Sequence, residues 1–209
     1  MDLTEYRTVA GENRDEFTEK KSRFIGHAAP ASSEEEARNF IDKIKSEYWN
    51  ASTNAFAYII REGNIQRYSD AGEPQGTAGV PSLEVLKKEG LVNVAVVITR
   101  YFGGIHLGAG GLLRAFSHAT KIAVDAATVI TMKLFELLEI ECQYSDYGKL
   151  QSEVLNFGGI IESTAFTDQV QMCFFISVEV TESFKKKITE VSSGKIVPFC
   201  KGCTWRTCN

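Results

Sequence analysis

The stretch LVNVAVVITRYFGGIHLGAGGLLR, residues 91–114, decides the fold of the first half of the chain. Its first nine residues are nearly all apolar and β-branched, a composition typical of a buried central strand. Five glycines then fall within residues 100–111, which predicts an irregular loop. From Leu112 to Ala126, apolar residues recur at helical spacing and predict an amphipathic helix. The stretch therefore indicates a strand, a glycine-rich loop and a helix in direct succession.

The flanking sequence adds strands and helices to this half. Ser33 and Glu36 have the spacing of a capping box, and apolar residues follow at helical spacing, so a helix is expected over 33–48. Glu-Gly-Asn separates two strand-like runs and predicts a hairpin turn. The other expected elements are strands over 22–28, 55–60 and 65–68, and a helix over 82–89 that Pro81 opens and Gly90 closes.

The second half of the chain alternates strands and helices in a compact pattern. The expected elements are strands over 135–144, 160–167, 170–180 and 195–199, and helices over 145–157 and 181–193. The order β-α-β-β-α-β within about 75 residues is the ferredoxin-like arrangement. We therefore expect an α+β protein with two domains, residues 1–132 and residues 133–209.

Composition and charge exclude several classes of protein. The 209 residues are 44% hydrophobic and 24% charged, proportions that support packed cores and argue against a disordered chain. The formal net charge of -4 argues against a strongly basic nucleic-acid-binding protein, although it is compatible with a local basic face. The apolar runs are much shorter than a membrane span, and the polar start is unlike a signal peptide. We therefore expect a cytoplasmic protein without membrane contacts.

Residues 69–81 form the first candidate functional loop. Three glycines and two prolines occur in these thirteen residues, a density that no regular element tolerates. Asp70 and Glu73 give the loop two carboxylates that suit a general base or a ligand contact.

Residues 99–114 form the second candidate loop, and its glycines have two interpretations. In one, glycine backbone N–H groups approach an anion at a helix start, and Arg100 and Arg114 contact its phosphate or carboxylate. In the other, the glycines let the helix pack tightly on the sheet, and Arg100 forms a structural ion pair with Glu73. The P-loop and Rossmann spacings are both missing.

Basic residues at the start of the first strand are a further candidate contact. Lys20, Lys21 and Arg23 lie beside Phe24, a combination that suits phosphate and a stacked base, although a solvated strand edge is the commoner explanation. Among the histidines, His27 is expected on the strand surface, whereas His106 lies in the glycine loop, where it suits an anion contact.

The cysteines near the C-terminus leave two interpretations open. Cys200 and Cys203 have CxxC spacing, and Cys208 follows five residues later. A metal or redox function is set against an incidental tail, and no metal or cofactor is assigned.

Three long motifs resemble the signatures of the IMPACT family in its bacterial, YigZ-like form. They are KKSRFI at 20–25, DxGEPxGTAGxP at 70–81 and RYFGGIxLGxGGLxRA at 100–115. The resemblance implies that the first half is a sheet with helices on one face and a left-handed βαβ crossover. Such a domain is shared with a ribosomal protein and domain IV of elongation factor G. It also implies that the second half resembles the ferredoxin-like last domain of that factor.

The resemblance also implies a link to translation, which eukaryotic relatives regulate through a kinase pathway that senses amino-acid starvation. They use an additional N-terminal domain for which this chain has no room, so that partner is not transferred. Two departures weaken a family-wide acid–base mechanism: Thr53 stands where members usually have histidine, and Val80 where they have a basic residue.

Two main functions follow as hypotheses. The first is a translation-associated binding protein that contacts RNA, the ribosome or another anionic partner. The second is an enzyme acting on a small phosphorylated or carboxylated ligand in a cleft at Glu73 and Arg100. A third interpretation is a protein–protein scaffold that uses the acidic second half. The candidate ligand-binding residues are Lys21, Arg23, Asp70, Glu73, Arg100, Tyr101, Gly103, Gly104, His106, Gly108, Gly110, Gly111 and Arg114.

Overall fold

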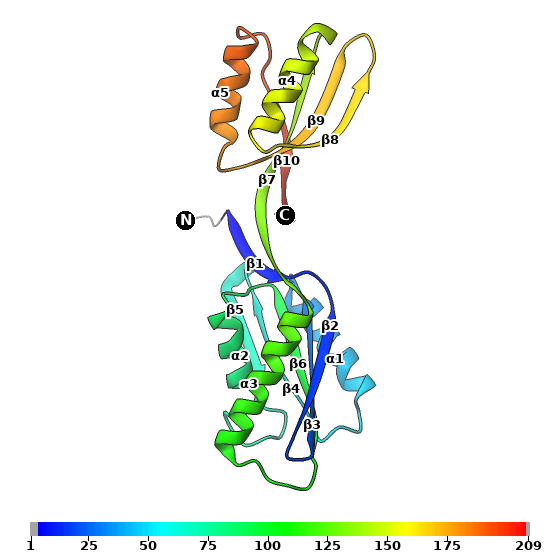
Figure 1. Cartoon of the computed structure of the whole chain (residues 1–209), viewed down its shortest axis with the longest axis vertical. Helices are drawn as coiled ribbons and strands as arrows, with labels where there is room; N and C mark the ends of the chain where they lie inside the picture. Colours follow the sequence, from blue (N-terminus) through cyan, green and yellow to red (C-terminus); the bar gives the residue numbers. More distant parts are fainter. Residues whose placement is uncertain (1–3, 208–209) are drawn as a thin grey trace. The chain divides into compact units, whose positions relative to one another are not determined.

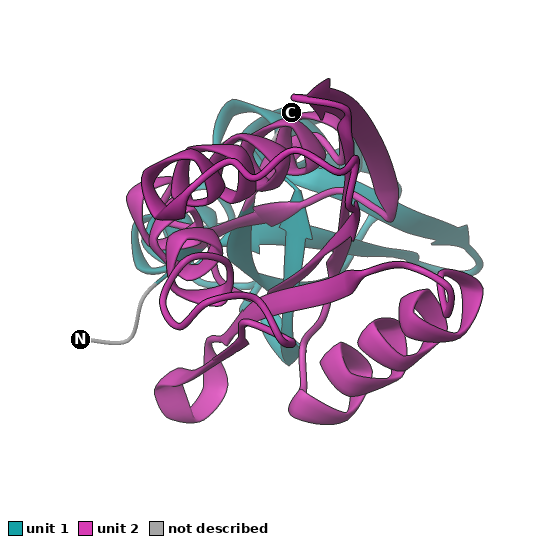
Figure 2. Ribbon diagram, turned by 90° about the horizontal axis from the view of Figure 1, so that it is seen from below, with its two compact units in different colours: residues 1–5, 132–209 teal, residues 6–131 magenta. Residues whose placement is uncertain are grey.

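The computed structural model describes residues 4–207 and divides the chain into two compact units (Figure 2). The N-terminal unit comprises residues 6–131. The C-terminal unit comprises residues 132–209 together with residues 1–5. The expected division between residues 132 and 133 places residues 1–5 in the first domain instead. Thr4 belongs to the C-terminal unit because its carbonyl accepts a 2.8 Å hydrogen bond from the Leu134 N–H and its hydroxyl donates to Glu179 at 2.9 Å.

A five-stranded antiparallel sheet forms the centre of the N-terminal unit (Figure 1). Its order is β2-β3-β6-β4-β5, with β2 at Asn13–Glu19, β3 at Ser22–Pro30, β6 at Val94–Tyr101, β4 at Thr53–Ile60 and β5 at Ile65–Ser69. The apolar stretch predicted as a buried central strand is β6, although it starts three residues later than the expected 91. This central position gives β6 partners on both edges, β3 and β4.

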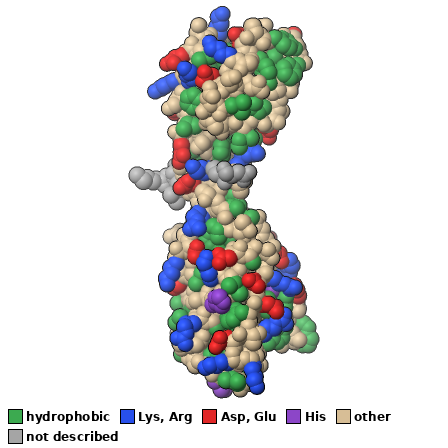
Figure 3. Space-filling model, in the orientation of Figure 1, with side chains coloured by type: hydrophobic (Ala, Val, Ile, Leu, Met, Phe, Trp, Pro, Cys, Tyr) green, Lys and Arg blue, Asp and Glu red, His purple; other side chains and the backbone are tan. Residues whose placement is uncertain are grey.

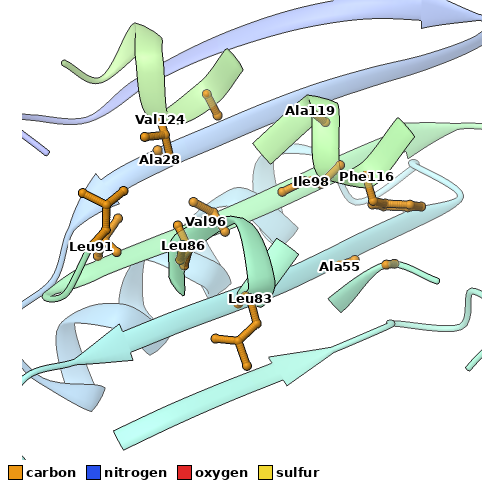
Figure 4. Close-up of a cluster of buried hydrophobic side chains, with 14 of the residues drawn as sticks. Ala28, Ala55, Leu83, Leu86, Leu91, Val96, Ile98, Phe116, Ala119 and Val124 are labelled. Carbon is orange, nitrogen blue, oxygen red and sulfur yellow. The ribbon is translucent and has the colours of Figure 1, made fainter. Parts of the chain in front are cut away.

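Helices cover both faces of this sheet, so the expectation of helices on one face is wrong. Helix α1 (Glu34–Glu47) packs on one face, and α2 (Gly79–Lys88) and α3 (Ala109–Ala126) pack on the other. Side chains alternate across a strand, and β6 is apolar at every position from 94 to 98. Val96 and Ile98 therefore join the core under α2 and α3 (Figure 4), whereas Val97 joins the core under α1.

The predicted helix over 33–48 is confirmed as α1. The Ser33 Oγ accepts a 3.1 Å hydrogen bond from the Glu36 N–H, as the capping-box spacing predicts. The Glu36 carboxylate accepts from the Ser32 N–H at 2.7 Å rather than from that of Ser33. The cap thus satisfies backbone donors at the helix start that have no partner within the helix.

Two strands near the N-terminus were not predicted. These are β1 (Glu5–Val9) and β2. The side chains of β2 are exposed except for that of Phe17, which is half-buried. Without a buried face, β2 has no apolar alternation to reveal it. A two-residue turn, Lys20–Lys21, joins it to β3, and both lysines have positive φ, 45° and 67°.

The C-terminal unit has the expected β-α-β-β-α-β order of elements. They are β7 (Val129–Cys142), α4 (Tyr144–Asn156), β8 (Ile160–Phe166), β9 (Val170–Ser177), α5 (Thr181–Val191) and β10 (Phe199–Thr207). All neighbouring strands among β7 to β10 pair antiparallel, in the order β10-β7-β9-β8, and β1 belongs to the same sheet. Phe174, Phe184 and Ile188 are buried between this sheet and its helices.

The prediction of the last strand over 195–199 is wrong. Residues 195–198 form no strand, and β10 runs instead through the cysteine-containing segment. The side chains of β10 are mostly exposed, so this segment has no apolar pattern. The apolar residues Ile196 and Val197 lie just before it and misleadingly suggest a strand there.

Among the described residues, no helix is long and apolar enough to cross a membrane.

Candidate functional site

The glycine-rich β6–α3 loop and the β2–β3 turn lie side by side at one end of the N-terminal unit (Figure 1). A Cβ on Gly103 would overlap the Lys21 carbonyl oxygen and lie 2.6 Å from the Lys21 Cβ, so only glycine fits there. The Gly103 N–H donates to the Ser22 Oγ at 3.2 Å, which ties the loop to the strand. At this position the glycine serves close backbone packing, one of the two interpretations left open by the sequence.

Arg100 and Glu73 form a buried ion pair between the two candidate loops. The Arg100 Nη1 donates to both Glu73 carboxylate oxygens, at 2.7 and 2.8 Å, and the two side chains are only 8% and 6% exposed. Thr53 donates to the Glu73 Oε1 at 2.9 Å, so its hydroxyl contacts this pair directly. The structural ion pair proposed from the sequence is therefore present, and it occupies both oxygens of Glu73.

Asp70 organises the first loop. Its carboxylate accepts hydrogen bonds from the backbone N–H groups of Gly76, Ala78 and Gly79 at 2.8 to 3.0 Å. Burial alone would raise the pKa of Asp70, but these three donors outweigh burial and hold the pKa below its usual value. All three donors lie between the tip of the loop and the start of α2, so Asp70 fixes the loop's shape rather than presenting a free base.

An apolar hollow of about 350 Å³ borders the ion pair. Its lining residues are Glu73, Pro74, Arg100, Phe102, His106, Leu107, Gly108, Ala109 and Leu112. The rings of Phe102 and His106 lie 5.2 Å apart, and Phe102 is 43% exposed. Arg100 lies against the rings of Phe24 and Phe102, with its guanidinium carbon about 5.5 Å from each centroid. The wall of this hollow is therefore aromatic, and the opposite charges of Arg100 and Glu73 neutralise each other.

A second hollow, of about 230 Å³, joins the turn, the loop and α3. Its lining residues are Phe17, Glu19, Lys20, Leu107, Gly111, Arg114, Ala115 and His118. The His118 ring packs edge-on against Phe17 with centroids 4.6 Å apart. On the face seen in Figure 3, Lys, Arg and His side chains lie at the lower end of this unit.

The remaining predicted residues fall into two groups. Arg23 on β3 pairs with Glu16 on the edge strand β2 at 2.6 Å, and the Tyr101 hydroxyl donates to Asn50 at 2.8 Å, so both have partners within the unit. Gly104 and Gly108 have positive φ, 83° and 74°, which favours glycine over other residues. Gly110 and Gly111 lie in the first turn of α3, where a Cβ on Gly111 would lie 2.9 Å from the Leu107 Cβ.

Sequence reasoning did not assign Phe17 or Thr53 to the ligand-binding residues, and it misplaced His27. Phe17 and Thr53 meet the predicted residues only through strand pairing, which no local pattern reveals. His27 is 3% exposed rather than on the strand surface, because it lies on the face of β3 that α1 and Tyr48 cover. Its imidazole lies 3.4 Å from the Thr99 hydroxyl.

Acid is expected to destabilise the N-terminal unit through His27. Burial is the main cause that lowers its pKa from 6.5 to about 4, and Arg14 adds to the effect. The unfolded chain then binds a proton that the folded chain does not, so stability falls as the pH drops from 6.5 towards 4. The loss between pH 7 and pH 5 is about 2 kcal/mol. Urea unfolding of the wild type and of His27→Asn at both pH values tests this; equal pH dependence in the two proteins contradicts it.

Fold and site together define a two-unit α+β protein whose N-terminal unit presents a glycine-rich loop clamped to a lysine turn. A family model, the Impact N-terminal domain, matches residues 20–124, which include all three motifs. A second model, a domain of unknown function (DUF1949), matches residues 140–195. The chain belongs to the IMPACT family.

Relatives match both units of the chain. The IMPACT family member YvyE of Bacillus subtilis is 40% identical over 92% of this chain and 89% of its own length. The family member YigZ of Escherichia coli is 27% identical over 85% of this chain and 88% of its own length. A crystal structure of a hypothetical protein, 25% identical, covers 96% of this chain and 98% of its own with a TM-score of 0.61. The mixed α+β fold with antiparallel sheets is thus found in a solved relative.

Proposed function

We propose that the protein is a translation-associated binding protein that contacts RNA in the cytoplasm through the surface around the second hollow. The observation that carries this proposal is the position of Lys20, Arg114 and His118 around one open hollow, although they come from a turn and a helix far apart in the sequence. Cationic side chains such as Lys20 and Arg114 are what the phosphates of RNA need. Phe17 forms the apolar wall of the hollow, where its ring is stacked on Phe24 and packed against His118.

The two units carry the finer part of the proposal. We take the N-terminal unit to be the counterpart of domain IV of elongation factor G, and the C-terminal unit to be ferredoxin-like, like the last domain of that factor. The strand order β10-β7-β9-β8 and the helix after β7 and after β9 support the second assignment. A protein with both units fits a partner in the translation machinery better than a free metabolite.

The enzyme hypothesis has less support from the same site. A general base needs a free carboxylate, yet Glu73 is buried against Arg100 and Thr53, and Asp70 accepts three backbone hydrogen bonds. With Thr53 at the usual histidine position, the site offers no imidazole there. The aromatic hollow beside the pair suits packing or stacking more than proton transfer.

Arg114→Ala and Lys20→Ala are each expected to weaken binding of labelled RNA and to lower its dependence on salt. Each removes a cation from the surface around the second hollow, so the slope of log affinity against log salt should fall by about one for each phosphate that the variant no longer neutralises. Fluorescence anisotropy at several salt concentrations measures both effects.

Lys88→Ala provides the matched control, because it removes an exposed lysine at the C-terminal end of α2. Its affinity and slope should equal those of the wild type. Equal losses in all three variants would reduce the interaction to net charge alone, and binding that ignores salt would overturn the proposal.

A further inference from the structure

The cysteines of β10 are brought together by an irregularity in the strand. Strand β10 pairs with β7, with Cys200 opposite Leu138 and Cys203 opposite Glu136, and the register shifts between Cys200 and Gly202. In a regular strand, residues three apart point to opposite faces of the sheet. An extra residue in a bulge reverses this relation, so both cysteines share one face.

The neighbouring contacts identify that face as the one covered by the helices. Leu138 is fully buried in the core beneath them, and the Lys185 Nζ of α5 donates to the Glu136 carboxylate at 3.2 Å. Lys201 lies between the cysteines and donates to Glu139, on the other face, at 2.6 Å. The alternation that places Lys201 away from α5 therefore leaves both thiols on the side of α5.

Both thiols are accessible. Cys200 and Cys203 are exposed and free, and the Cys200 Sγ donates to the Gly202 carbonyl oxygen at 3.7 Å. Partial burial and the adjacent Cys200 thiol raise the pKa of Cys203. The raised pKa lowers the fraction of Cys203 that is thiolate, the reactive form.

We propose that Cys200 and Cys203 are a redox-active dithiol on strand β10, which a small-molecule disulfide oxidises to an intramolecular disulfide. The Cys200 thiolate attacks one sulfur of the external disulfide and releases one thiol as a mixed disulfide forms. The Cys203 thiolate then attacks the Cys200 Sγ and releases the second thiol. The protein loses two electrons and two protons, and the external disulfide gains them as two thiols.

The number of ligands favours this chemistry over a metal site. A structural zinc ion needs four ligands. Among residues 4–207, no group of three or more His, Cys, Asp or Glu side chains is arranged to hold a metal ion. A disulfide needs, in contrast, only two cysteines, provided that their Cα atoms lie within about 7 Å of each other and their side chains share a face. Among the described strands β10 pairs with β7 alone, so a bond across the bulge would rigidify a strand at the edge of the sheet.

Trypsin separates the three C-terminal cysteines, which makes the pairing readable. Cleavage after Lys195, Lys201 and Arg206 gives the peptides 196–201, 202–206 and 207–209, each with one cysteine. The full chain is equilibrated with oxidised and reduced glutathione at a series of ratios, alkylated and digested without reduction. We expect peptides 196–201 and 202–206 to be recovered as one species linked by a disulfide, with the loss of two hydrogen atoms.

Two variants make the outcome decisive. Cys208→Ser should oxidise to the same extent as the wild type, whereas Cys200→Ser should lose the linked species completely. Cys208 lies outside the described residues, so a link between 202–206 and 207–209 would overturn the assignment. A mixed disulfide with glutathione that persists at Cys200, or no oxidation at any ratio, would overturn it as well.

Discussion

Replacing Arg100 with alanine is expected to lower the free energy of unfolding of the N-terminal unit by about 3–5 kcal/mol. The change leaves the Glu73 carboxylate, 6% exposed, without its guanidinium partner in a low-dielectric surrounding. The Thr53 hydroxyl would still donate to that carboxylate. Urea unfolding measures the change in the free energy of unfolding. Amide hydrogen exchange in β6 shows that the loss lies in the N-terminal unit. Glu73→Ala should cost a similar amount, because it leaves Arg100 charged and buried.

Two comparisons test the physical cause of this loss. Arg23→Ala removes the pair with Glu16, which has nearly the same N–O distance, 2.6 Å, but side chains about half exposed. It should cost no more than about 1 kcal/mol, since water screens exposed pairs. The double variant Arg100→Met, Glu73→Leu should recover much of the loss, because no unpaired charge remains buried. A loss for Arg23→Ala as large as that for Arg100→Ala would contradict the dependence on burial.

The parts of the fold that the sequence predicted are those with a buried face. Helix α1 and strand β6 each bury a regular set of apolar side chains, and their patterns were readable. Strand β2 is exposed along most of its length, and β10 is exposed through its cysteines, so pairing with a neighbour defines them instead. Pairing between distant segments leaves no local trace in the sequence.

The candidate site was predictable at the level of loops but not of contacts. The sequence located Glu73 and Arg100 in two irregular segments and offered their ion pair as one alternative, which the structure contains. The sequence does not show which glycine of the loop is required for close packing. In the structure it is Gly103, which packs against Lys21. That packing depends on a turn whose two lysines adopt positive φ, a conformation more typical of asparagine and glycine.

Replacing Gly26 with alanine is expected to destabilise the N-terminal unit by about 3 kcal/mol or more. Gly26 lies in the middle of β3, on the face that packs against α3. A Cβ there would overlap the Ala119 carbonyl oxygen and lie 2.9 Å from the Ala123 Cβ. Neither atom belongs to a side chain that can rotate away, so α3 must move off the sheet and disturb the core around Phe116.

Gly11→Ala is the matched control for this substitution. No heavy atom lies within 4 Å of a Cβ placed on Gly11, and its φ is not positive, so the same methyl group meets no obstacle. Its stability should equal or slightly exceed that of the wild type, since alanine restricts the unfolded chain. Because the added methyl group meets Ala119 and Ala123 of α3, Gly26→Ala should also raise amide exchange at Ala119–Ala123. Unchanged exchange there, together with full stability, would show that β3 and α3 are not closely packed at Gly26.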